Sequence, residues 1–257
     1  MRTGKCKLCL QTKTLLKESH IIPQFLYKLI TDENHFMVFV DNKKARNRQN
    51  SEFEANILCK DCDNRVIGKL DDYFARYLHD NFPRKYKPTL IIIDGIEYAV
   101  RENDPNYDYV KYKLFLLSLL WRSSISSRPF FMGVKLSSVV EESLRTMIIN
   151  NDPGEPDEYP CFIFLPPLLH APDGGRGFDA FYMPTISPVT NKNADWEICK
   201  FVIEGMTYFF IVSRPPSSRV EPSVGKDRLL MRISSIEEQS EMHKIILEKM
   251  RGHKPKK

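Results

Sequence analysis

Two kinds of hydrophobic pattern along the chain predict helices. Over residues 61–80, apolar side chains recur at spacings of three and four, which places them on one face of an amphipathic helix. That face consists of Val66, Leu70, Phe74 and Tyr77. Residues 108–126 are apolar on nearly every side, as expected of a buried helix. Further helices are expected from Pro23, over 138–150, and near Ser235, where Ser-Ile-Glu-Glu has the capping-box pattern.

Short apolar runs between turn residues predict strands. The expected strands are one ending at His20-Ile21-Ile22, residues 36–40, two around the Asp94-Gly95 turn, residues 161–165, and 196–204 and 206–213 around Glu204-Gly205. Two polar or turn-rich segments, 41–50 and 166–177, are interpreted as loops. The mixture of helices and strands predicts an α+β fold.

A proline-bounded basic segment, residues 83–88, is the predicted boundary between two domains. The domains would be residues 1–82 and residues 89–257, the second being a mixed α+β domain. The composition fits a globular protein, because 42% of the 257 residues are hydrophobic and 28% are charged.

The net charge of +5 is concentrated at the N-terminal end of the chain. Residues 1–50 contain ten Lys and Arg residues but only four acidic residues. A basic loop in this region carries Lys43, Lys44, Arg46 and Arg48, which are predicted to contact nucleic-acid phosphates. The alternative is that these cations form only a solvated surface.

No segment of the sequence predicts export or membrane insertion. The N-terminal residues lack the apolar run of a secretory signal. The most apolar stretch, 114–121, is far shorter than the about 20 residues that span a bilayer. We therefore expect a cytoplasmic protein that does not contact a membrane, in a compartment where paired cysteines are more often metal ligands than disulfides.

Four of the six cysteines form two Cys-x-x-Cys pairs, Cys6/Cys9 and Cys59/Cys62. Two such pairs predict a structural Zn²⁺ held by four thiolates. The 49 residues between the pairs exceed the spacing of a simple zinc ribbon and favour a treble-clef-like module, in which the second pair opens a helix. A redox pair and four unrelated thiols are the alternatives. Cys161 and Cys199 lie in apolar segments and are expected to be buried.

Three short segments carry a family resemblance. They are His20-Ile21-Ile22-Pro23, Asn56-Ile57-Leu58-Cys59 and Cys62-Asp63-Asn64. In combination, they resemble the HNH (His-Me finger) endonucleases over about residues 6–78. The resemblance implies a zinc-stabilised ββα module at the N-terminus, with the cleft of a metal-dependent endonuclease.

The resemblance also implies roles for individual residues. His20 would be the general base that deprotonates the attacking water, because a neutral imidazole is abundant at pH 7. Asn56 would orient the imidazole. Asp63, or alternatively Asn64, would bind a catalytic Mg²⁺ or Mn²⁺, which neutralises charge on the scissile phosphate. The partner would be nucleic acid, with DNA as the expected substrate.

The sequence departs from the family at Ser19, where the family usually has Asp, Glu or His as a second metal ligand. On a strand, Ser19 would point away from the face that carries His20. This departure leaves open a catalytically inactive zinc module that binds nucleic acid or a protein. A third alternative is an enzyme whose active site lies in the C-terminal domain. By analogy, the nuclease would serve microbial restriction or antiviral defence, and the C-terminal domain would provide recognition, regulation or a protein partner's docking site.

Overall fold

The computed structural model describes most of the chain. The described residues are 2–27, 37–40, 45–48, 53–81, 89–165, 168–170, 176–178, 185–191, 196–203, 206–213, 220–235 and 237–238. The predicted linker 83–88 lies outside them, as do most residues of the predicted C-terminal helix.

The helices follow the predicted ranges closely. They are η1 (Gln24–Tyr27), η2 (Asp61–Ile67), α1 (Gly68–Asn81), α2 (Tyr109–Ile125), η3 (Pro129–Phe131) and α3 (Ser138–Asn150). Side-chain caps start the two longer C-terminal helices: Asp108 accepts a hydrogen bond from the Lys111 amide, and Ser137 accepts one from the Val140 amide. The helix expected from Pro23 is a single 3₁₀ turn over its described residues.

The helix predicted over 61–80 begins with a π-helix rather than with regular α-helical turns. In η2 the Gly68 amide donates to the Asp63 carbonyl, five residues back. Such wide turns are rare in proteins and often occur at functional sites. The face predicted from periodicity is largely confirmed, since Leu70, Phe74 and Tyr77 of α1 are buried.

Seven strands form one mixed sheet in the order β12-β13-β14-β9-β15-β8-β7. The strands are β7 (Thr89–Ile93), β8 (Ile96–Glu102), β9 (Cys161–Leu165), β12 (Thr185–Asn191), β13 (Trp196–Ile203), β14 (Met206–Ser213) and β15 (Arg228–Ile233). All neighbours are antiparallel except β15 and β9, which are parallel. The Asp94-Gly95 hairpin is confirmed, with both residues at positive φ. Strands β12 and β15 were not predicted.

Four two-stranded ladders complete the described strands. Their members are β1 (Arg2–Lys5) with β2 (Thr12–Leu15), β3 (Ser19–His20) with β6 (Phe53–Glu54), β4 (Met37–Val40) with β5 (Ala45–Arg48), and β10 (Leu168–His170) with β11 (Arg176–Phe178). The expectation of loops over 41–50 and 166–177 was therefore wrong in part, because β5, β10 and β11 lie inside these segments. Antiparallel pairing to a neighbouring strand overrides their polar composition.

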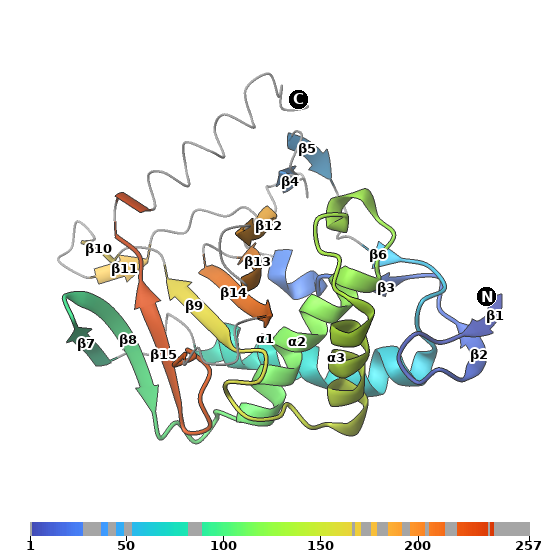
Figure 1. The fold of residues 1–257 in the computed structure, drawn as a ribbon, viewed down its shortest axis with the longest axis horizontal. Coiled ribbons are helices and arrows are strands. Elements are labelled where there is room, and N and C mark those ends of the chain that lie inside the picture. The colour runs from blue at the N-terminus through green and yellow to red at the C-terminus, as the bar shows by residue number, and fades with distance from the viewer. Residues whose placement is uncertain are drawn as a thin grey trace.

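Helix α2 is the centre of the fold (Figure 1). Every residue from Tyr112 to Ile125 is buried, and both α1 and α3 pack against this helix. Figure 1 shows α2 and α3 between the large sheet on one side and the β1–β2 hairpin on the other. A single cluster of buried side chains extends from Cys6 to Ile233, so residues on both sides of the predicted domain boundary share one core. The fold is α+β, as predicted.

Candidate functional site

The four paired cysteines meet at one point. Cys6 follows β1 and Cys9 lies in the turn before β2, where Leu10 adopts a positive φ of 61°. The Cys59 amide donates to the Cys6 sulfur at 3.4 Å, which joins the two pairs. The four Sγ atoms all lie within 4.8 Å of one another.

This cluster fits a metal such as zinc. Tetrahedral Zn²⁺ with bonds of about 2.3 Å requires sulfur–sulfur separations of about 3.8 Å, within the observed range. The Cys62 thiol donates to Cys6 and lowers the pKa of Cys6 to about 4, while the same contact raises the pKa of Cys62. A thiolate is therefore already favoured among these sulfurs, and thiolate is the form that binds metal.

His20 lies on β3, directly beside a tightly packed segment. Ile21 and Ile22, which follow it, are buried, and Ser19, which precedes it, is completely buried. In the β3–β6 ladder Ser19 pairs with Glu54 and His20 pairs with Phe53. The imidazole-bearing residue itself remains half-exposed. The strand is therefore held by its neighbours, and the exposed part of His20 borders accessible space.

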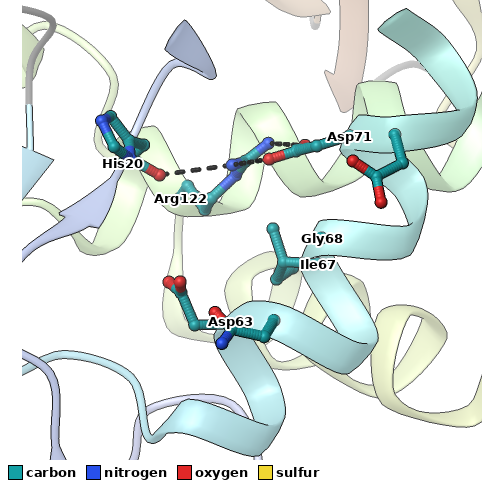
Figure 2. Close-up of a pocket in the computed structure, with 8 residues that line it drawn as sticks. His20, Asp63, Ile67, Gly68, Asp71 and Arg122 are labelled. Atoms are coloured by element: carbon teal, nitrogen blue, oxygen red, sulfur yellow. Dashed lines mark hydrogen bonds and ion pairs between the residues drawn. The ribbon is translucent and has the colours of Figure 1, made fainter. Parts of the chain in front are cut away.

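The accessible space is an open pocket of about 260 Å³. Its lining residues come from β3, η2, α1 and α2, and they are His20, Asp63, Asn64, Ile67, Gly68, Asp71, Asp72 and Arg122. Figure 2 shows Arg122 between His20 and Asp71. Asp63 lies on η2, the helical segment that precedes Asp71 of α1. Three predicted site residues, His20, Asp63 and Asn64, are thus brought together.

Two further residues of the pocket, Asp71 and Arg122, were not predicted to belong to it. The Arg122 guanidinium forms a double hydrogen bond with the Asp71 carboxylate, at 3.0 and 3.1 Å. Its Nη1 also donates to the His20 carbonyl at 3.2 Å. One signal was present in the sequence: a charged residue inside an apolar helix must find a partner when it is buried.

The pocket is acidic and partly desolvated. Asp63, Asp71 and Asp72 face one arginine. Burial raises the pKa of Asp63, although the Ser19 hydroxyl, Arg122 and His20 all favour its ionised form. Burial also raises the pKa of Asp71, against the opposing effect of Arg122. Ser19 itself does not line the pocket: its hydroxyl is buried and has no hydrogen-bond partner among the described residues.

Asn56, the predicted partner of His20, is not brought into the pocket. Asn56 is exposed, at a positive φ of 62°, and its amide donates to the Leu16 carbonyl. It does not line the pocket with His20. Lys43 and Lys44 lie outside the described residues. Arg46 and Arg48 belong to β5, and only their backbone is described.

Within the described part of the chain, the cysteine cluster is the one group of three or more His, Cys, Asp or Glu side chains that is placed to hold a metal ion. The pocket offers fewer converging ligands than this. Mg²⁺ usually keeps several waters and is bound by one or two carboxylates together with substrate phosphates. Asp63, with the Asn64 amide beside it, provides oxygen ligands of that kind.

None of the helices among the described residues has both the length and the apolar character needed to cross a bilayer.

Comparisons with known proteins yield no relatives: no family model, no curated protein and no solved structure matches this chain significantly.

Proposed function

We propose that the protein is a metal-dependent endonuclease that hydrolyses phosphodiester bonds in nucleic acid, with DNA as the expected substrate. The observation that carries the proposal is that His20 of β3 and Asp63 of η2 line the same open pocket. These are the two residues to which the HNH resemblance assigns the general base and a metal ligand. The antiparallel pairing of β3 with β6, and the position of η2 and α1 after β6, support a ββα unit, although η1, β4 and β5 lie between the two strands in the sequence.

The chemistry would be divided between two walls of the pocket, one formed by β3 with His20 and the other by η2 with Asp63 and Asn64. The His20 imidazole removes a proton from a water molecule, which then attacks the phosphorus atom. Asp63 and Asn64 provide oxygen atoms for a divalent cation, and burial keeps the Asp63 carboxylate from being fully solvated. The bound cation would neutralise charge on the phosphate and stabilise the leaving oxygen.

The acidity of the pocket supports metal dependence. A phosphodiester carries a negative charge, and the pocket presents three carboxylates but only one guanidinium. That guanidinium is already paired with Asp71. A divalent cation would offset the negative charge of the pocket, whereas without it the substrate would meet an excess of like charge.

The cysteine cluster would have a structural role in this arrangement. Cys59 and Cys62 flank the start of η2, and Asp63 follows Cys62 directly. A zinc ion held by the four thiolates would fix the first turn of η2, and with it the position of Asp63. The context of restriction or antiviral defence in a microbial cytoplasm is part of the proposal and rests on analogy alone.

A cleavage assay tests the proposal. Supercoiled plasmid and a long RNA are incubated with purified protein and Mg²⁺ or Mn²⁺, and the His20→Ala variant is compared with wild type. Loss of a general base reduces the rate by about 10²–10⁴-fold. We expect cation-dependent nicking of DNA by wild type and loss of that rate in His20→Ala.

The result that overturns the proposal is equally clear. Wild type that cleaves neither nucleic acid, or His20→Ala that cleaves as fast as wild type, rules out this site as a nuclease centre. Circular dichroism and zinc content of the variant must match wild type, so that a lost rate is not a lost fold.

One observation favours a second candidate, a zinc module that binds nucleic acid or protein without cleaving. Ser19 occupies the position of the family's second metal ligand, and it is completely buried. Ser19 does not line the pocket, and a neutral hydroxyl is a weak ligand. This candidate predicts gel-shift binding of the same DNA with no cleavage at any cation concentration.

A further inference from the structure

We propose that Arg122 is a positioning residue that holds the general base of the pocket in place from outside the N-terminal region. The inference rests on the proposed nuclease function of His20. Arg122 is on α2, 102 residues after His20 in the sequence, and its side chain is 1% exposed. It touches the His20 main chain and Asp71 at the same time.

The hydrogen bonds of Arg122 show that it positions the site rather than binding the phosphate. A guanidinium has five N–H donors. Two go to the Asp71 carboxylate and one goes to the His20 carbonyl. The other two go to the Ser118 carbonyl and hydroxyl, both at 3.3 Å. All five donors therefore have protein acceptors, and none is left for a substrate oxygen.

The contact with His20 connects the two walls of the pocket. Asp71 is on α1, which continues directly from η2 and Asp63. Because one rigid guanidinium binds both the His20 carbonyl and Asp71, the strand that carries the base is fixed relative to the helix that carries the metal ligand. Figure 2 shows this arrangement, with Arg122 between the other two residues.

The segment after α2 holds the paired strand in the same way. Glu54 of β6 accepts hydrogen bonds from the Ser126 hydroxyl at 2.6 Å and from the amide and hydroxyl of Ser127. Arg128 donates to the carbonyl of Phe53, the residue that pairs with His20. The β3–β6 ladder has only two residues on each strand. Arg122 of α2 contacts β3, and the segment that follows α2 contacts β6.

A ladder this short cannot fix its own geometry, which is why the external contact matters. A displacement of about 1 Å at a reacting group can cost on the order of 10²-fold in rate. Loss of the Arg122 contact would free the His20 main chain without removing the imidazole. The expected consequence is a lower kcat with little change in KM, because Arg122 does not contact the substrate.

The test compares Arg122→Lys with a matched control, Arg145→Lys. Arg145 of α3 likewise joins a carboxylate and a distant main-chain carbonyl: it forms a double hydrogen bond with Glu142 of its own helix and donates to the Leu8 carbonyl at 2.7 Å. It does not line the His20 pocket. Lysine keeps the positive charge for the carboxylate in both variants, but one ammonium cannot reproduce the fork and also reach the carbonyl.

Two readouts are collected for each variant: kcat and KM for DNA cleavage, and amide hydrogen exchange in β3 and β6. We expect Arg122→Lys to lower kcat about 10²-fold with KM within about twofold, and to accelerate exchange in the β3–β6 ladder. Arg145→Lys should keep kcat within about twofold and leave exchange in that ladder unchanged.

Three outcomes would overturn the inference. Equal loss of kcat in both variants would show a general stability effect, unchanged kcat in Arg122→Lys would show no role, and a raised KM alone would show substrate contact. Failure of the proposed function is distinguishable, since it appears as a wild type that does not cleave. Exchange in the ladder then decides by itself whether Arg122 fixes β3.

Discussion

The cysteine cluster and the His20 pocket both use η2 but are built by different means: Cys62 belongs to the cluster, and Asp63, which follows it, lines the pocket. The cluster takes two ligands from the turn between β1 and β2 and two from around the start of the helical segment that contains η2, and their four sulfur atoms lie within 4.8 Å of one another. The pocket takes its residues from four elements, including a helix that follows the predicted domain boundary. A metal bound by the four thiolates would set the geometry of the first site, whereas packing and hydrogen bonds set that of the second.

Because of this difference, the two sites depend on different kinds of residue. A metal cluster draws its rigidity from the bonds to the ion, so it depends on the ligands themselves. An open pocket that must admit water and substrate has no such bonds, so it depends on residues behind its walls. In this protein those residues are the buried aromatic side chains between α1 and α2, together with Arg122 and Glu54.

The largest expected effect is removal of metal from the cysteine cluster. Structural zinc contributes an apparent binding free energy of about 10–16 kcal/mol at pH 7 to small zinc modules. Chelation, or the Cys62→Ser substitution, should therefore unfold the region around η2, as followed by the thermal melt. Metal analysis should find about one zinc per chain of wild type. Cys199→Ser is the matched control, because that buried cysteine lies outside the cluster and its loss should leave the zinc content unchanged.

A smaller effect is expected from the packing behind the pocket. The Phe74 ring of α1 stacks on the Phe115 ring of α2, with centroids 3.8 Å apart, and is 1% exposed. Phe74→Ala should lower the free energy of unfolding by about 3–5 kcal/mol in urea titration. The half-exposed Phe209 provides the control, since Phe209→Ala should cost less. The zinc content of Phe74→Ala should match that of wild type. A lower zinc content would show that the cysteine cluster also depends on this packing.

The charge of Asp63 should affect Mn²⁺ binding and cleavage more than the charge of the nearby Asp61. Asp63→Asn removes the carboxylate proposed to bind the catalytic cation, so Mn²⁺ affinity and cleavage should each fall by on the order of 10²-fold. Asp61 lies on the same helix but outside the pocket, where it pairs with Lys13 at 3.3 Å. Calorimetric titration with Mn²⁺ should show unchanged affinity in Asp61→Asn. Equal loss in both variants would remove Asp63 from the metal site.

The smallest expected effect concerns pH and the contact between β6 and the end of α2. Burial alone would raise the pKa of Glu54, but hydrogen bonds from Ser126 and Ser127 outweigh it and lower the pKa. A lowered pKa in the folded state means that the contact stabilises the protein above the ordinary pKa of 4.5 and that this stability is lost as pH falls through the folded value.

Urea titration between pH 6 and pH 3 checks this linkage. Wild type should lose more stability over that range than Glu54→Gln, by on the order of 1 kcal/mol. The reverse order, or parallel losses, would show that Glu54 is not held as a carboxylate by the two serines.

Features encoded within a few residues could be predicted from the sequence. The two Cys-x-x-Cys turns placed the metal cluster, and Asp94-Gly95 placed a hairpin. The capping box was also confirmed, since Ser235 and Glu238 exchange the reciprocal hydrogen bonds of that motif. In each case the chemistry that forms the structure lies inside the motif itself.

Features that depend on distant partners could not be predicted. Strand β12 contains Pro188, which argues against a strand, yet β12 forms an edge of the sheet, where proline is tolerated. Strand β15 takes its place between β9 and β8, which come much earlier in the sequence. Arg122 and Asp71 are 51 residues apart, and no local pattern joins them. The full set of pocket residues could therefore be identified only from the folded structure.

The position of Arg122 on α2 also limits how this protein can be recombined. An N-terminal region that ended at the predicted boundary would carry His20, Asp63 and all four clustered cysteines but would lack the guanidinium that joins the His20 main chain to Asp71 of α1. Exchange of the C-terminal half with that of another protein would break the site unless the new half supplied an arginine at the same depth and a hydrogen-bonding loop for Glu54. The complete site therefore requires both halves of the chain, although the recognisable motifs all lie in the N-terminal half.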